Sequence, residues 1–257
     1  VYGRCFVSEL PRFEGTPIHV TFSKHHNHYY VSFIFLMNDD YIQSKQKTII
    51  SNQIDRVGID LGVKTFATCV DSKGRKIFIN NQNKKIIPLI NKIMYYKTRM
   101  YKCYRVNKKA TKNFYRWYDK FRNLNKRLTN IQYDFLQKLT TVLCRVYKTI
   151  VLEDLYIDEL KQKHKNCDDF NNLLKSMCFW KFRKLIEYKM KIYNGSLVIV
   201  DKYFPSSQIC SNCGSIQKMP VKYRVYNCPK CGISIDRDVN AAMNILNEKN
   251  RIEIIVG

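Results

Sequence analysis

The stretch RVGIDLGVKTFATCVDSKGRK, residues 56–76, predicts a β-strand that carries one carboxylate between two glycines. With the two-residue period of a strand, Gly58, Asp60 and Gly62 share one face, and apolar residues form the other. A surface aspartate on an edge strand, with the glycines marking a bulge, would explain this pattern. The second interpretation is a carboxylate kept clear of neighbouring side chains, so that a metal ion and a backbone can approach it.

The composition favours a nucleic-acid partner. The 257 residues are 45% hydrophobic, which is enough to bury the core of one large domain or two smaller ones. Lysine and arginine number 45 against 21 acidic residues, and a polyanion would balance the net charge of +24. We find neither a signal peptide nor an apolar run of about 20 residues. We therefore expect no membrane partner and an intracellular location: the cytoplasm or nucleoid, or the nucleus for a eukaryotic or viral source. The chain begins at Val1, as a fragment or a processed product would.

Short alternating patterns surround the strand that carries Asp60. Residues 17–35 alternate apolar and polar positions on both sides of a polar tip, which predicts a β-hairpin, and a polar linker is expected over residues 38–53. After the Asp60 strand, residues 66–70 and 76–79 flank a tight turn and predict an antiparallel meander.

The second half of the chain adds two strands with continuous apolar runs, over residues 149–155 and 196–201. Such runs suit central strands that are covered on both faces. A helix is expected between them, over residues 173–193. The order of elements is compatible with an RNase H-like α/β sheet that carries large insertions.

Residues 84–148 have a different pattern, with apolar residues at steps of three and four, and predict a helical hairpin that turns near residues 107–113. We interpret its aromatic stripe as packing. The segment holds 18 lysines and arginines against two acids, whereas solvated helices with salt bridges mix their signs. We expect a nucleic-acid surface here, with these contacts: Lys108, Lys109, Lys112 and Arg116.

The cysteine spacing C-x2-C-x14-C-x2-C predicts a zinc ribbon. Four thiolates fill a tetrahedral zinc and leave no position for a substrate, so the ion would be structural. The expected ligands are Cys210, Cys213, Cys228 and Cys231. Basic residues of the same segment are further candidates for nucleic-acid contacts: Lys222 and Arg224.

Three carboxylates are candidates for a second metal site. Asp60 lies amid glycines, and Glu153 ends a strand that is otherwise apolar, where a carboxylate is costly unless it is paired or binds a metal. Asp238 lies in the first turn of a predicted helix for which Asp236 is a suitable N-cap. Carboxylates on neighbouring elements can hold two Mg²⁺ or Mn²⁺ ions about 4 Å apart, one to activate water and the other to stabilise the leaving oxygen of a phosphodiester.

Six motifs, in this order, resemble the RuvC nuclease and zinc ribbon of transposon-associated TnpB proteins: GIDLGVKTFAT, NIQYDFLQKLT, VLEDL, YFPSSQICSNCG, CPKCG and DRDVNAAMNIL. That family is related to compact type V CRISPR effectors and to eukaryotic and giant-virus counterparts. The resemblance covers residues 54–248 and implies an α/β fold with an RNase H-like (RuvC) mixed sheet. The helical hairpin of 84–148 and a zinc ribbon of 205–235 would be inserted in it, and 249–257 would form a tail. Residues 1–50 would be the end of the family's N-terminal β-barrel.

The resemblance also implies an activity, RNA-guided and Mg²⁺-dependent cleavage of DNA by Asp60, Glu153 and Asp238. Guide RNA and a DNA target would be the partners, with the basic hairpin holding the heteroduplex backbone. The glycines beside Asp60 would clear space for the strand being cut. Two alternatives remain, a transposase or resolvase that joins strands with the same carboxylates, and a nucleic-acid-binding fragment without catalysis.

Overall fold

The structure is a computed structural model, and the chain divides into two units, Val1–Ile49 and Ile50–Gly257. The residues whose structure is described are 6–7, 16–25, 28–36, 39–153, 177–220, 222–248 and 251–254.

The first unit contains the predicted hairpin. Strands β1 (Pro17–His25) and β2 (His28–Phe35) pair antiparallel, and many of their apolar side chains are exposed. The expected polar linker is wrong over part of its length, because helix α1 (Asp39–Gln46) forms there. The physical reason is local charge: two aspartates lie in the first turn of α1 and a lysine in the last, which complements the helix dipole.

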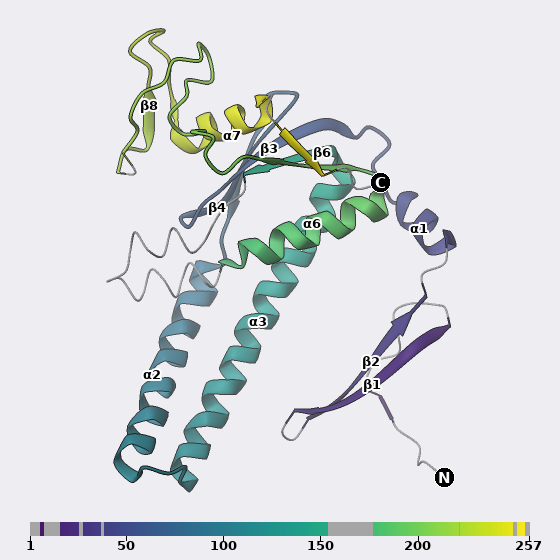
Figure 1. Cartoon of the computed structure of the whole chain (residues 1–257), viewed down its shortest axis with the longest axis vertical. Helices are drawn as coiled ribbons and strands as arrows, with labels where there is room; N and C mark the ends of the chain where they lie inside the picture. Colours follow the sequence, from purple (N-terminus) through teal and green to yellow (C-terminus); the bar gives the residue numbers. More distant parts are fainter. Residues whose placement is uncertain are drawn as a thin grey trace. The chain divides into compact units, whose positions relative to one another are not determined.

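The second unit is built on a six-stranded mixed sheet with the order β10-β7-β6-β3-β4-β5 (Figure 1). Strand β3, which carries Asp60, pairs parallel with β6 and antiparallel with β4, so the edge-strand interpretation is wrong. Strands β6 and β7 also pair parallel. The strands are β3 (Ile54–Leu61), β4 (Thr65–Asp71), β5 (Lys76–Asn80), β6 (Tyr147–Glu153), β7 (Ser196–Val200) and β10 (Arg251–Ile254).

Two predicted boundaries differ from the structure. The expected C-terminal tail contains strand β10, which pairs antiparallel with β7 at one edge of the sheet. Helix α6 (Phe179–Tyr193) begins after Cys178, whose positive φ of 54° interrupts helical geometry. Residues 173–176 of the predicted helix, and the last two residues of the strand predicted over 149–155, lie outside the described residues.

The predicted helical hairpin is confirmed as α2 (Asn83–Asn107) and α3 (Lys112–Val146), which extend together away from the sheet (Figure 1). Lys108 ends α2 in the left-handed conformation, and the Thr111 side chain accepts a hydrogen bond from the Phe114 amide to begin α3. The aromatic stripe packs between the helices, as in the stacked rings of Tyr96 and Trp117, 5.8 Å apart. Within the described residues, no helix is long and apolar enough to cross a membrane.

The sheet is covered on both faces. On one face, Val70 of β4 packs with Val239, Ala242 and Leu246 of helix α7 (Arg237–Asn247). The other face is covered by α3 and α6, where the rings of Phe135 (α3), Phe179 and Phe182 (α6) surround Phe66 with centroids 5.2–5.6 Å away.

Lys189 of α6 ties the base of the helical hairpin to this second face. Its side chain is only 5% exposed, and Nζ donates to Gln137 O, Thr140 Oγ1 and Thr141 Oγ1 of α3 at 2.7–2.8 Å. Burial lowers the pKa of Lys189 to about 8. Since β6 follows α3 directly, the hairpin is anchored next to the strand that carries Glu153.

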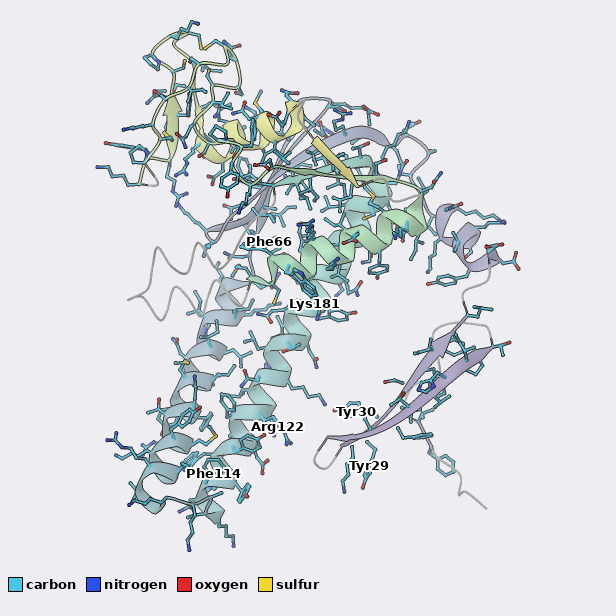
Figure 2. The ribbon with its side chains drawn as sticks, viewed as in Figure 1. Tyr29, Tyr30, Phe66, Phe114, Arg122 and Lys181 are labelled. Carbon is cyan, nitrogen blue, oxygen red and sulfur yellow. The ribbon has the colours of Figure 1, made fainter. Side chains whose placement is uncertain are left out.

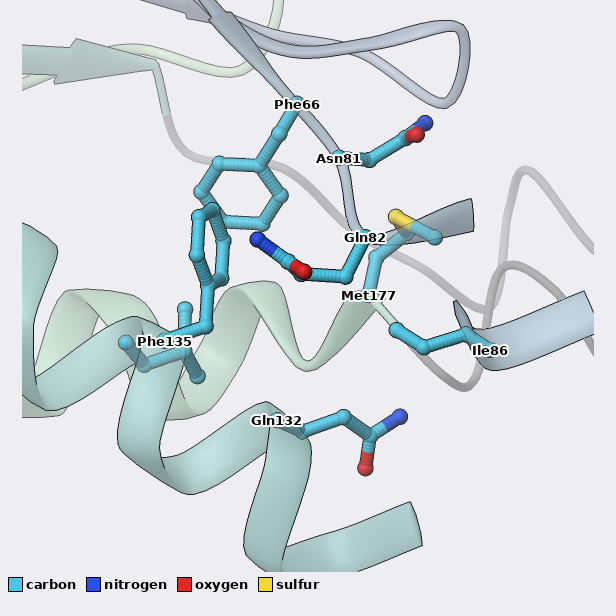
Figure 3. A pocket seen from close by; sticks show the side chains of 8 residues that line it. Phe66, Asn81, Gln82, Ile86, Gln132, Phe135 and Met177 are labelled. Atoms are coloured by element: carbon cyan, nitrogen blue, oxygen red, sulfur yellow. The ribbon is translucent and has the colours of Figure 1, made fainter. Parts of the chain in front are cut away.

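A small pocket lies where the hairpin meets the sheet, between Phe66, Gln82, Gln132 and Met177 (Figure 3). Its volume is about 10 Å³, which is room for about one water molecule. The pocket is therefore too small for a substrate, and it is lined by none of the predicted site residues.

Candidate active site and metal centre

Two of the three candidate carboxylates lie side by side at the ends of adjacent parallel strands. Gly58 pairs with Val151, and Ile59 pairs with Leu152, so the next residues along β3 and β6 are Asp60 and Glu153. Val151 packs with Ile245 of α7, and strand side chains alternate between faces. Glu153 therefore points to the α7 face, and so does Asp60, two residues after Gly58.

Gly58 lies directly under the backbone of α7. A Cβ built on Gly58 would lie 2.6 Å from Leu246 N and 2.7 Å from Leu246 Cβ, closer than real Cβ contacts. The expectation that this glycine clears space for a DNA strand is therefore wrong, because helix α7 fills that space. On Gly62, a Cβ would lie 2.9 Å from Thr65 O in the turn to β4. The backbone that approaches the strand at Gly58 is that of α7.

Helix α7 brings in the third carboxylate. Asp236 caps the helix, since its Oδ1 accepts from Asp238 N at 3.0 Å and from Val239 N at 3.1 Å. The prediction that Asp236 serves the helix backbone is thus confirmed. The side chain of Asp238 is 30% exposed, and its Oδ2 lies 3.9 Å from an Nη atom of Arg224 in the ribbon.

The charges of Glu153 and Asp238 both act on the carboxyl group of Asp60. Burial, followed by the charges of Glu153 and Asp238, raises the pKa of Asp60 well above its ordinary value. Burial also raises the pKa of Glu153 to about 7, against a hydrogen bond from Ser206 that lowers it. The negative charges of Glu153 and Asp238 acting on Asp60 provide a field that favours a divalent cation.

The four cysteines form a compact group. Their Sγ atoms all lie within 4.8 Å of one another, and among the described residues this is the one such group of three or more potential metal ligands. Two Sγ–Sγ distances are 3.6 Å, between Cys210 and Cys231 and between Cys213 and Cys228. A tetrahedral zinc with Zn–S bonds of about 2.3 Å requires sulfurs about 3.8 Å apart. The donor set therefore fits zinc in both chemistry and spacing.

The glycines after each cysteine pair shape the two knuckles. Gly214 and Gly232 have φ of +72° and +74°, and their amides donate to the carbonyls of Cys210 and Cys228. Hydrogen bonding, first from Ser215, lowers the pKa of the Cys228 thiol to about 6. A lowered thiol pKa favours the thiolate, which is the form that binds metal.

Three polar residues near the carboxylates were not predicted. Ser206 Oγ donates to Glu153 Oε2 at 3.4 Å, and two buried asparagines of α7, Asn240 and Asn244, bond to the loop that contains Ser206. The two asparagines could have been found from the motif DRDVNAAMNIL, in which they stand four residues apart in a predicted apolar helix and therefore lie on one side of it.

The predicted nucleic-acid residues fall on two surfaces. Lys108, Lys109, Lys112 and Arg116 are exposed around the turn of the helical hairpin. The two acids of the hairpin pair with its own cations, Asp119 with Arg122 at 4.0 Å and Asp134 with Lys138 at 2.8 Å. Figure 2 shows Phe114 and Arg122 along α3. Lys222 and Arg224 are exposed on the ribbon, where Arg224 lies beside Asp238.

The fold and site are those of a mixed α/β protein with neighbouring carboxylates on its sheet and a four-cysteine ribbon. Two family models match the chain, one described as "Probable transposase" (OrfB_IS605) over residues 42–164, and one as "Cas12f1-like, TNB domain" over residues 179–245. These matches confirm the resemblance to the TnpB family.

Individual relatives agree with the family models. A protein of Streptomyces pristinaespiralis named "Putative RNA-guided DNA endonuclease" is 33% identical over 83% of this chain and 49% of its own length. The "TnpB-like protein L79" of Acanthamoeba polyphaga mimivirus is 27% identical over 84% of this chain and 40% of its own length. The chain thus spans about half the length of the curated relatives it matches.

A solved structure shares the fold. The cryo-EM structure of a CRISPR-Cas12f ternary complex aligns with 90% of this chain and 45% of its own, with a TM-score of 0.57 at 19% identity.

Proposed function

We propose that the chain is the nuclease portion of an RNA-guided DNA endonuclease, with an RNase H-like (RuvC) site formed by Asp60, Glu153 and Asp238. The observation that carries the proposal is the position of these carboxylates on the α7 side of the sheet, where burial, followed by the charges of Glu153 and Asp238, raises the pKa of Asp60. Relatives named as putative RNA-guided DNA endonucleases support the activity, and the chain spans about half of their length.

The three carboxylates would hold Mg²⁺ or Mn²⁺, which when bound activates water and stabilises the leaving oxygen of a phosphodiester. Burial raises the pKa of both Asp60 and Glu153, so cation binding at these groups and proton release are coupled. Asp238 lies in the first turn of α7. Arg224 is 50% exposed beside Asp238 and can contact a phosphate that reaches the site.

The helical hairpin would bind the nucleic-acid backbone. The two acids of the hairpin pair with Arg122 and Lys138, not with the exposed basic residues around the turn. The positive charge around the turn therefore stays available for phosphates. Contacts to phosphates position a duplex without reading its sequence, which suits a protein that takes its specificity from a guide RNA. The four cysteines would hold one structural zinc.

The test is cleavage of DNA by the full-length protein with its guide RNA and Mg²⁺. Asp60→Ala, Glu153→Ala and Asp238→Ala should each nearly abolish cleavage and leave nucleic-acid binding largely intact. Asp55→Ala is the matched control, since Asp55 is an exposed aspartate of the same strand, and it should cut normally.

The products separate the alternatives. Free 5′-phosphate ends without joined strands indicate hydrolysis, whereas joined strands indicate a transposase or resolvase. Binding of guide and target with no cleavage at any Mg²⁺ concentration indicates a binding module. Normal cutting by the Asp60 variant would contradict the assigned site.

A further inference from the structure

Helix α7 has two buried asparagines on a surface that is otherwise apolar. The side chain of Asn240 is fully buried and that of Asn244 is 7% exposed, among apolar neighbours such as Ala241 and Ile245. A buried amide costs free energy unless it is hydrogen-bonded, and residues four apart lie on one side of a helix. The two side chains therefore act on the same neighbouring segment.

That segment is the loop between β7 and the first cysteine knuckle, residues 206–211. Asn244 Nδ2 donates to Ser206 O and to Ile209 O, both at 2.7 Å. Asn240 Nδ2 donates to Ile209 O at 2.7 Å, and its Oδ1 accepts from Ser211 N at 2.9 Å. We call these contacts the asparagine clamp. Each of these hydrogen bonds joins an asparagine side chain to the main chain of the loop. The clamp therefore fixes the backbone conformation of the loop independently of the loop's own side chains.

The clamped loop connects the cysteine cluster to the carboxylates. Ser206 is 6% exposed, and its Oγ donates to Glu153 Oε2 at 3.4 Å. Cys210, at the other end, is one of the four cysteines and is 1% exposed. Phe204, just before the loop, packs against the core under α7.

The ribbon reaches a second carboxylate by another route. An Nη atom of Arg224 lies 3.9 Å from Asp238 Oδ2, and the Arg224 carbonyl accepts a hydrogen bond from Arg237 N at 2.8 Å where α7 begins. Two residues of the predicted ribbon therefore contact carboxylates of the site: Ser206 contacts Glu153, and Arg224 lies beside Asp238.

We infer that Asn240 and Asn244 are positioning residues that couple the cysteine ribbon to the carboxylate site, so that an intact ribbon is needed for tight binding of the divalent cation. Ser206 transmits the coupling to Glu153. This inference rests on the proposed function, because it takes the three carboxylates to be the cation site. Groups outside the ligand shell of a metal typically change affinity or activity by about 10–100-fold.

The test measures Mn²⁺ binding by calorimetry on the zinc-loaded full chain, without nucleic acid. Mn²⁺ prefers the same oxygen ligands as Mg²⁺. Asn244→Leu keeps the side-chain size and removes both donors, and it should weaken Mn²⁺ binding by about 10–100-fold while one zinc per chain is retained. Asn247→Leu is the matched control, because Asn247 is an exposed asparagine of the same helix, and its Mn²⁺ affinity should equal that of the wild type.

Two further variants keep the inference testable if Asn244→Leu does not fold. Ser206→Ala leaves the clamp and removes only the hydroxyl that faces Glu153, so Mn²⁺ binding should weaken by about tenfold and Ser206→Thr should restore it. Cys228→Ser should release zinc and weaken Mn²⁺ binding at the distant carboxylates as well.

The outcomes separate this inference from the proposed function. If Asp60→Ala abolishes Mn²⁺ binding but Asn244→Leu or Ser206→Ala binds Mn²⁺ as the wild type does, the coupling is overturned and the proposed site stands. If the clamp has a purely structural role, these variants should have a lower melting temperature and unchanged Mn²⁺ affinity. If Asp60→Ala leaves Mn²⁺ binding unchanged, the proposed cation site falls, and the coupling falls with it.

Discussion

The substitution Gly58→Ala tests the packing of α7 on the sheet. The added methyl would lie 2.6 Å from the Leu246 amide nitrogen and 2.7 Å from Leu246 Cβ, and it would also meet the carbonyl oxygen of Ala242. None of these atoms is the end of a flexible side chain. Shortening a neighbouring side chain therefore cannot relieve the contact, and α7 itself must move away from β3.

The geometry sets the size of the effect. The separation from Leu246 must grow from 2.6 Å to at least 3.0 Å, the shortest distance that real Cβ atoms show. Overpacking of this kind costs about 1–3 kcal/mol. For a domain of this size each kcal/mol lowers the melting temperature by about 2–4 °C, so we expect a fall of about 2–12 °C. Because α7 carries Asp238, and misplacement by about 1 Å can cost about 100-fold in rate, cleavage should fall at least about tenfold.

Thermal unfolding and cleavage by the full-length guided protein are measured together. Gly74→Ala is the matched control, because Gly74 has φ of +76° and nothing within 4 Å of its added Cβ. This substitution should cost about 1–2 kcal/mol of backbone strain in the turn between β4 and β5, and cleavage should be unchanged. A Gly58→Ala protein with the wild-type melting temperature and weakened DNA binding would refute the reasoning and favour a glycine that makes room for nucleic acid.

Three further predictions concern the metals, the pH dependence and the charge. Cys228→Ser should lower the zinc content and unfold the ribbon, because metal binding contributes folding free energy directly, and elemental analysis checks this. Since the folded-state pKa of Glu153 is about 7 against an ordinary 4.5, the folded chain binds more protons than the unfolded chain between these values, and stability falls as pH rises through them. Glu153→Gln should therefore be more stable than the wild type at pH 8 without added divalent cation, and similar below about pH 4, in urea unfolding. Four hairpin residues can be neutralised together: Lys108, Lys109, Lys112 and Arg116. This change should flatten the slope of log K for nucleic-acid binding against log salt by a few units, equally for nucleic acids of unrelated sequence. An unchanged slope would show that the hairpin does not bind phosphates.

Local chemistry in the sequence determined most of the elements. Apolar steps of three and four predicted α2 and α3, and their junction lies where Lys108 and Thr111 end one helix and begin the next. Asp236 was recognised as the cap of α7 because a short acceptor before an apolar helix satisfies its first amides. The cysteine spacing predicted a cluster because two residues between cysteines suit a single tight knuckle.

Tertiary structure alone decided how these elements meet. The central position of β3, the place of β10 beside β7 and the burial of Gly58 under α7 depend on contacts between residues far apart in the sequence. The asparagine clamp also depends on such a contact, since the Asn244 amide donates to Ser206 O, 38 residues earlier in the sequence. A periodic pattern records which side of an element is buried, but the partner that buries it is selected by the folded chain as a whole.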